Sequence, residues 1–372
     1  MTNPIIHSIG VAVPPNKISQ ELHYGILASA NGLNRAEQLT LKTIYAKSGI
    51  QYRHSVLNEF GNADSPGHRI WHPSGNFPST GVAERMAVYE EYAAGLCGEA
   101  VKESFRILPA LKPEDITHVV TFSCTGMYAP GLDIQLVEIM GLPRHAERTC
   151  INFMGCYAAI NAFKNAWHIA RSQPDAVVLI AGVELCSLHY QKSNDPNQMI
   201  ANALFSDGAA AAIISSKDIQ PDRRHPAFCI RDFYAEFEQS ATNDMIWRIG
   251  NAGFDLRLTP EVPNVLRGNI RGLLDKLFLR AGLTQADIDH YAIHPGGAKI
   301  LEACETALGI SKEDNAASYA VLREYGNMSS VTVMFVLKAY MDSIPGGEHG
   351  KNILACAFGP GITMESMIVS TC

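Results

Sequence analysis

Three near-continuous apolar segments constrain the fold of this 372-residue chain most strongly: His118 to Ser123, Ala176 to Val183 and Ala209 to Ser216. Strands of this kind belong in sheets whose two faces are both covered. Helical patterns alternate with them, the longest running from Ser79 to about Phe105. The alternation predicts an α/β architecture in which helices cover the sheets.

A polar stretch from Lys217 to Pro226 separates two parts of the chain that echo each other. The second part begins with a predicted strand, Phe228 to Phe237, and a predicted helix, Val262 to Arg280. It ends with two predicted strands, Ile353 to Phe358 and Met364 to Val369. We therefore expect a duplicated unit, with one half at residues 1–220 and the other at residues 221–372.

Composition excludes several classes of protein. The net charge is −7 and no block of Lys and Arg is present, which argues against nucleic acid and anionic membranes as partners. The start of the chain lacks a signal-peptide pattern, and no apolar run is long enough to span a bilayer. Nine cysteines without CxxC spacing indicate reduced thiols, so we expect a cytoplasmic protein.

A metal site is not expected. His68 and His72 have the i, i+4 spacing of helical ligands, but Pro66, Gly67 and Pro73 argue against a helix there.

The segment from Thr149 to Ala162 contains the strongest candidate nucleophile, Cys156. An apolar, strand-like run stops at Gly155, and an Ala-rich segment that favours a buried helix continues to about Arg171. Free backbone N–H groups and the positive end of the helix dipole would lower the thiol pKa from about 8.5. The alternative is that Cys156 is a small buried side chain without chemistry.

Two further polar residues stand at the ends of apolar elements. His294 follows the predicted strand Tyr291 to Ile293, and Asn327 precedes an apolar helix from Ser329 to Asp342. Ligands of α/β sheets bind outside the carboxyl ends of strands, so these residues could meet Cys156 there. Taken singly, each is better explained as a turn residue, and only their matched placement in the two halves favours a joint site.

A cysteine, a histidine and an asparagine together suit one type of chemistry. A thiolate can hold an acyl group as a thioester, while imidazole and carboxamide donors stabilise an enolate oxygen. This combination could decarboxylate a malonyl thioester and condense its carbanion with the acyl-enzyme. Such a reaction needs neither a metal nor a redox cofactor, so no cofactor is expected.

Several motifs of the chain resemble type III polyketide synthases, the chalcone synthase-like family, and Cys124 is of a kind seen in bacterial members. The motifs are Phe153 to Ala159, Ile293 to Gly297, Gly326 to Ser330, Phe358 to Thr363, Ala203 to Ala210 and Pro130 to Asp133. The resemblance implies a thiolase-like fold, in which duplicated halves enclose buried central helices in αβαβα layers. It also implies a homodimer that uses malonyl-CoA and an acyl-CoA starter.

The resemblance further implies roles for single residues. Cys156 would carry the acyl chain, and His294 would keep it as a thiolate and, with Asn327, stabilise the malonyl-derived enolate. Phe205 matches a gatekeeper between the CoA tunnel and the cavity. The remaining matches are expected to contact pantetheine, the pocket or the CoA phosphates, and they are Gly296, Gly297, Ser329 and Lys47.

The chain departs from the plant enzymes at several positions. The second gatekeeper, usually Phe, is aligned with Leu256, and Ala129 replaces a Met that reaches across the plant dimer. The cavity positions are Cys124, Thr125, Cys186 and His189, although Cys124 and Cys186 could be plain buried thiols. These changes favour an acyl starter and an alkylpyrone or alkylresorcinol-like product.

The CoA-binding positions also differ. Thr40 and Thr43 replace two basic residues of the plant enzymes. The phosphates could instead meet Lys42, Lys47 or Lys299, or the donor could arrive on an acyl carrier protein.

Three other readings remain open from the residues. A single-round ketoacyl synthase that initiates fatty-acid synthesis with malonyl-acyl carrier protein shares the Cys/His/Asn logic but usually has a His-Gln-Ala-Asn type motif. A cysteine hydrolase of the papain type would place its Cys near the N-terminus in a Cys-Gly-Ser-Cys-Trp setting, which is absent. A catalytically silent scaffold would not need to retain all three polar residues.

Overall fold

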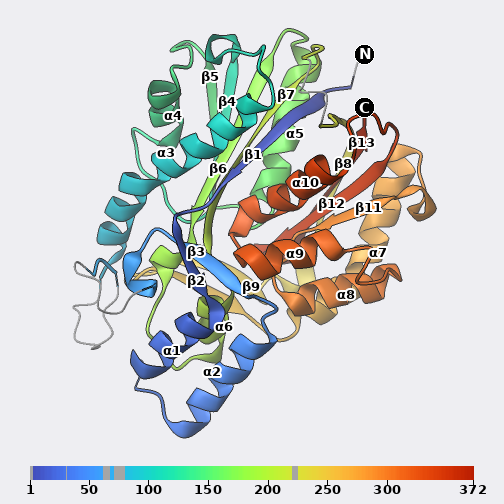
Figure 1. Cartoon of the computed structure of the whole chain (residues 1–372). Helices are drawn as coiled ribbons and strands as arrows, with labels where there is room; N and C mark the ends of the chain where they lie inside the picture. Colours follow the sequence, from blue (N-terminus) through green and yellow to red (C-terminus); the bar gives the residue numbers. More distant parts are fainter. Residues whose placement is uncertain (1–2, 31, 62–67, 71–79, 220–224) are drawn as a thin grey trace.

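The computed structural model describes residues 3–30, 32–61, 68–70, 80–219 and 225–372, and nine of its strands form one large sheet (Figure 1). These strands are β1 (Ile5–Ala12), β4 (His118–Ser123), β5 (Glu147–Asn152), β6 (Val177–Leu185), β7 (Asp207–Ser215), β8 (Phe228–Phe237), β11 (His290–Ile293), β12 (Asn352–Gly359) and β13 (Thr363–Thr371). Their order is β11-β12-β13-β8-β1-β7-β6-β4-β5. Two small sheets pair β2 (Asn16–Ser19) with β3 (Tyr52–Ser55) and β9 (Met245–Ile249) with β10 (Phe254–Leu258).

Helices cover both faces of the large sheet. The helices of the described residues are α1 (Gln20–Ala30), α2 (Arg35–Lys47), α3 (Val82–Arg106), α4 (Leu132–Met140), α5 (Ala158–Ser172), α6 (Pro196–Leu204), α7 (Val262–Ala281), α8 (Ala298–Leu308), α9 (Ala316–Tyr325) and α10 (Thr332–Ser343). Of these, α1, α2 and α6 lie apart from the large sheet and pack on one another and on the small sheets (Figure 1). None of the helices in the described ranges is both long and apolar enough to cross a membrane.

The two ends of the sheet repeat one another. The order β4-β6-β7-β1 at one end corresponds to β11-β12-β13-β8 at the other. In both series the first pair is parallel and the next two pairs are antiparallel. The series meet where Ile5 and Ile6 of β1 pair with Cys229 and Phe228 of β8. The expected duplication is therefore present, while the boundary predicted at 220/221 lies outside the described residues and stays a prediction.

The buried side chains group into layers that match the αβαβα expectation. α5 and α10 share one core cluster with β4, β6, β12 and β13, so these two helices lie between the halves of the sheet. α3 covers the outer face of the first half, and α7 and α8 cover the outer face of the second. The two central helices therefore place their N-termini in the interior, between the halves.

The close packing of α3 on β1 gives a stability prediction. A Cβ at Gly10 would lie 2.1 Å from the Ala100 carbonyl oxygen and 2.4 Å from the Ser104 amide nitrogen, both backbone atoms of α3. We expect Gly10→Ala to lower the free energy of unfolding by about 2–3 kcal/mol, because the helix must move away. Gly25→Ala on α1 is the control, since nothing lies within 4 Å of its Cβ and the change should be neutral or stabilise by up to about 1 kcal/mol. Equal unfolding midpoints for both variants in urea would contradict the prediction.

Candidate active site

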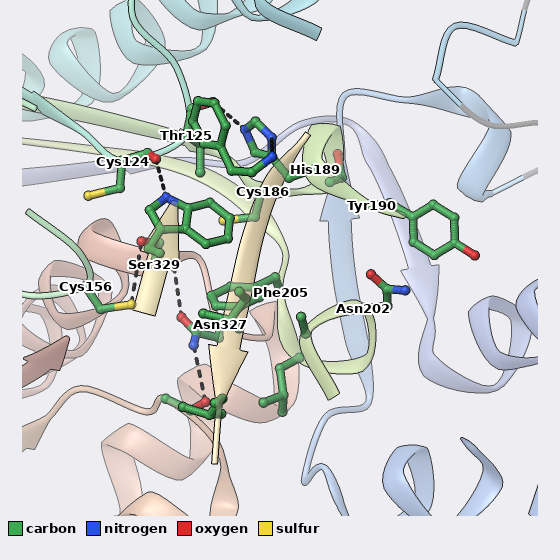
Figure 2. A pocket seen from close by; sticks show the side chains of 18 of the residues that line it. Cys124, Thr125, Cys156, Cys186, His189, Tyr190, Asn202, Phe205, Asn327 and Ser329 are labelled. Carbon is green, nitrogen blue, oxygen red and sulfur yellow. Dashed lines mark hydrogen bonds between the residues drawn. The ribbon is translucent and has the colours of Figure 1, made fainter. Parts of the chain in front are cut away.

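One cavity brings together most of the residues that the sequence singled out. It encloses about 1200 Å³ of empty space, its open mouth included. In Figure 2, Cys156 and Ser329 lie on one side of it, Tyr190 and Asn202 lie on the other, and Phe205 lies between them. The predicted residues in its lining are Cys124, Thr125, Cys156, Cys186, His189, Phe205, Leu256, His294, Gly296, Asn327 and Ser329.

Cys156 is held by the turn that enters the central helix α5. Gly155 before it has a φ of 94°, and a Cβ there would lie 2.2 Å from Pro360, so only glycine fits. The Gly155 N–H donates to Cys124 Sγ at 2.9 Å, which ties this turn to the end of β4. The helix itself begins at Ala158, two residues later than the nucleophile.

His294 directly follows β11 and is almost completely buried, with an exposed fraction of 1%. Its backbone N–H donates to the Cys356 carbonyl of β12 at 2.8 Å. Neither ring nitrogen has a hydrogen-bond partner among the residues that the structure describes, which is unusual for buried polar atoms and leaves both available for a substrate or a proton.

Asn327 is fixed through both its backbone and its side chain. Its backbone N–H donates to the Leu204 carbonyl at 3.0 Å, and its carbonyl accepts from the Ser206 N–H at 2.9 Å. Its side-chain Nδ2 donates to the Gly296 carbonyl at 3.2 Å, and Oδ1 accepts from the Ser329 N–H at 2.9 Å. The amide is therefore connected to the loop that carries His294.

Ser329 links the cysteine to the asparagine. Its hydroxyl oxygen lies 3.6 Å from Cys156 Sγ, and its backbone bonds Asn327. Among the hydrogen bonds of the described residues, Cys156 Sγ meets Ser329 and neither His294 nor Asn327. Ser329 adopts a positive φ of 48°, which is uncommon for a residue with a side chain.

Burial dominates the ionisation of the two titratable groups taken singly. Desolvation raises the pKa of the Cys156 thiol to about 12, although the hydrogen bond from Ser329 partly opposes it. Desolvation also lowers the pKa of His294 to about 3. The helix dipole was expected to lower the thiol pKa, and for an isolated Cys156 thiol this expectation is wrong. The cost of burying one charge exceeds the effect of a helix that starts two residues away.

The sequence reasoning missed two groups at this site. Trp247 on β9 lines the cavity and donates its indole N–H to the Cys124 carbonyl at 2.9 Å. It packs edge-on against His189 and Phe254, which stack on each other at 4.0 Å. Leu256 on the neighbouring strand β10 was expected at the cavity from the family resemblance, but no motif of the sequence pointed to Trp247 on β9.

The second missed group is Glu184, a fully buried carboxylate at the end of β6. It accepts from the Cys124 N–H at 3.0 Å and from the Thr125 hydroxyl at 2.7 Å, and it also accepts from the Ser330 hydroxyl. The predicted strand ended at Val183, one residue before Glu184, whereas β6 continues to Leu185. Glu184 joins the ends of β4 and β6 to the turn before α10.

Two predicted residues lie outside the cavity lining. Gly297 is buried, and a Cβ there would lie 3.5 Å from Leu204. Lys47 is the last residue of α2 and is exposed, as are Lys42 and Lys299. The described residues contain no group of three or more His, Cys, Asp or Glu side chains that could hold a metal ion, and His72 lies outside them.

Known proteins resemble this chain over its whole length. The family model for chalcone and stilbene synthases, N-terminal domain, matches residues 2–218, and the one for the C-terminal domain matches residues 234–372. The "Alpha-pyrone synthesis polyketide synthase-like Pks18" of Mycobacterium tuberculosis is 32% identical over 291 residues, which cover 78% of this chain and 74% of that protein. The "Type III polyketide synthase C" of Arabidopsis thaliana is 27% identical over 376 residues, which cover 97% and 94%.

A solved structure shows the same architecture. PKS-I from the brown alga Ectocarpus siliculosus matches with a TM-score of 0.91 and 30% identity, covering 100% of this chain and 99% of that one. The fold is therefore thiolase-like, as expected. The chain belongs to the chalcone and stilbene synthase family and is a type III polyketide synthase, an acyltransferase that performs decarboxylative condensation.

Proposed function

We propose that this enzyme loads an acyl starter from CoA onto Cys156, extends it iteratively with malonyl-CoA and cyclises the chain to an alkylpyrone or alkylresorcinol-like product. The observation that carries the proposal is the single cavity that holds Cys156, His294 and Asn327 with room beyond them. The relative named for alpha-pyrone synthesis supports this class of product.

The hydrogen-bond inventory of the site suits an enolate. A carboxamide has two N–H donors, and Asn327 uses one on the Gly296 carbonyl, which leaves one for a substrate oxygen. Both His294 ring nitrogens are unpartnered, so its N–H can donate to the same oxygen. Loss of CO₂ from malonyl-CoA leaves the bonding electrons in an enolate that these two donors stabilise. The enolate carbon attacks the acyl carbonyl, and the Cys156 thiolate leaves.

Formation of the thiolate requires His294. Burial opposes a charge on either group alone, but a proton passing from Cys156 to His294 creates two opposite charges together, which attract strongly in a dry cavity. We propose that this ion pair is the reactive form.

The other expectations are proposals of the same kind. Phe205 and Leu256 line the cavity and would form the gate for pantetheine, with Lys47 near the CoA phosphates. Thr125, Cys186 and His189 would shape the pocket. The exposed edge strand β5 would lie in a homodimer interface. We further propose a cytoplasmic enzyme that uses malonyl-CoA and acyl-CoA without a cofactor, and that binds neither nucleic acid nor membrane.

The function is tested by product masses. Purified enzyme with malonyl-CoA and a panel of aliphatic and aromatic acyl-CoA starters should give cyclised products that contain at least two added acetate units. Cys156→Ala should reduce condensation by about 10³-fold or more, because no acyl-enzyme forms. A product with one added acetate, or turnover only with malonyl-acyl carrier protein, would favour the single-round ketoacyl synthase. Turnover with aromatic starters alone would overturn the alkyl product.

The ion pair predicts a specific pH dependence. Thiolate is the form that iodoacetamide alkylates, so in His294→Ala the raised thiol pKa should make Cys156 labelling slow at pH 7 and faster with each pH unit up to about 10. The wild-type protein should label at least about tenfold faster at pH 7. Peptide mass spectrometry would measure this, with the same cysteine peptide from fully alkylated, unfolded protein as the reference. Coincident pH profiles would contradict the ion pair.

The position of Trp247 in the cavity wall leads to a prediction about product size. Replacing the indole by a methyl group in Trp247→Ala should open space beside Cys124, so the enzyme should accept longer starters or add further acetate units. Trp247→Phe keeps most of the ring but loses the N–H donor, and it should give an intermediate distribution. Identical product masses from wild type and Trp247→Ala would show that this wall does not limit the chain.

A further inference from the structure

Two arginines beside the cavity are buried in an unusual way. Arg53 on β3 and Arg85 on α3 have exposed fractions of 3% and 4%. Within the described part of the chain, neither forms an ion pair with a carboxylate, and both instead donate to backbone carbonyls. Burying a guanidinium is costly, so such contacts must be well formed if the charge is to be kept.

The carbonyls that Arg53 contacts belong to the end of α6. Its Nη1 donates to the Asn202 carbonyl at 2.8 Å and to the Phe205 carbonyl at 2.9 Å, and its Nη2 donates to the Ala203 carbonyl. The last carbonyls of a helix have no partner within the helix and carry its negative end. The planar fork of one arginine therefore closes this helix end.

The same short segment meets the catalytic asparagine on its other side. Leu204 and Ser206, which flank Phe205, exchange backbone hydrogen bonds with Asn327 at 3.0 and 2.9 Å. Arg53, the Phe205 segment and Asn327 are thus consecutive in one set of hydrogen bonds, which starts in the first half of the chain and ends in the second.

Gln20 fixes the guanidinium in place. Its Oε1 accepts from Arg53 Nε at 3.1 Å, and its Nε2 donates to the Ala203 carbonyl at 2.9 Å. Gln20 therefore holds both the arginine and one of the carbonyls that the arginine binds.

We propose that Arg53 is a positioning residue for the condensation: its fork sets the end of α6, and through it the Phe205 gate and the Asn327 amide. The inference rests on the proposed function. Arg53 also lines the cavity, but within the described residues its hydrogen bonds go to Gln20 and to the backbone carbonyls of Asn202, Ala203 and Phe205. Its loss should therefore misplace the enolate donor while leaving the Cys156 thiol in place.

Arg85 provides the matched comparison. It is buried to the same degree, and it donates to the Tyr190 carbonyl at 2.9 Å, to the Thr80 carbonyl at 3.2 Å and to the Leu188 carbonyl. These partners belong to the turn around His189 and to the segment before α3, whereas the hydrogen bonds that Asn327 donates go to the Leu204 and Gly296 carbonyls. Arg85→Met thus removes a buried guanidinium without breaking the set of bonds that ends at Asn327.

The test separates the enolate step from the thiol. Malonyl-CoA decarboxylation without a starter reports on the enolate donors, and alkylation of Cys156 reports on the thiol. For Arg53→Met and Arg53→Lys we expect kcat for decarboxylation to fall at least about tenfold, KM for malonyl-CoA to change less than about threefold, and alkylation to stay within about twofold. Lysine should rescue little, since it keeps the charge but not the fork. The loss in Arg85→Met should be at least about fivefold smaller.

Decarboxylation within about threefold of wild type in both Arg53 variants would overturn the proposal, as would an equal loss in Arg85→Met. If circular dichroism shows that the Arg53 variants do not fold, the Gln20→Met variant is tested in their place. Its decarboxylation rate should fall about three- to tenfold, and an unchanged rate would overturn the proposal. A wild-type enzyme that does not decarboxylate malonyl-CoA would instead remove the proposed function and this inference with it.

Discussion

The backbone bridge between Phe205 and Asn327 is the contact on which the active site depends. It joins the segment that carries Phe205 to the one that carries Asn327, for which we propose the roles of gate and enolate donor, although the two segments are remote in sequence. Asn327 then bonds the Gly296 carbonyl and the Ser329 N–H, so His294 and Cys156 are each one further contact away. A shift of the bridge would move the donors relative to the thiol, which makes the geometry of the whole site a property of the contact between the halves.

Burial then determines what these groups can do. A cavity that excludes water makes an isolated thiolate or imidazolium costly, which the raised pKa of Cys156 and the lowered pKa of His294 both express. The same exclusion strengthens an attraction between opposite charges and a hydrogen bond to a developing enolate. The site therefore favours steps in which charges form in pairs or against fixed donors, and it disfavours a free charge. This selectivity fits a decarboxylation whose product anion must be held and not protonated by water.

The sequence predicted the parts of the fold whose patterns are strong. The strands His118–Ser123 and Phe228–Phe237 have the predicted bounds. The first is buried along its whole length, and the second begins with buried residues at alternate positions, so each shows a clear strand pattern. The helices α4, α6 and α9 were not predicted as elements, and β5 was expected only as a strand-like run that stops at Gly155. β5 is mostly exposed and carries Glu147 and Arg148, so it shows no buried-strand pattern. Of the hairpin that brings Trp247 into the cavity, β10 alternates between apolar and polar residues but β9 does not. The place of Trp247 is set by tertiary contacts with His189 and Phe254. Family motifs located the residues of the cavity, but only the coordinates showed that Glu184 and the two buried arginines support it.

The duplication explains why residues far apart along the chain converge. β4 in the first half corresponds to β11 in the second, and Cys124 and His294 are the residues that directly follow these two strands. In the same way α5 corresponds to α10, and Cys156 and Ser329 stand in the turns before them. Because the central helices of both halves lie between the sheets, a pseudo-symmetric fold brings both pairs of positions to one place. The two halves carry different residues at these equivalent positions: Cys156 against Ser329, and Cys124 against His294. The proposed nucleophile and the proposed donor therefore need no further rearrangement of the fold to meet. The chemistry thus arises from the sequence difference between the halves, while their structural likeness supplies the convergence.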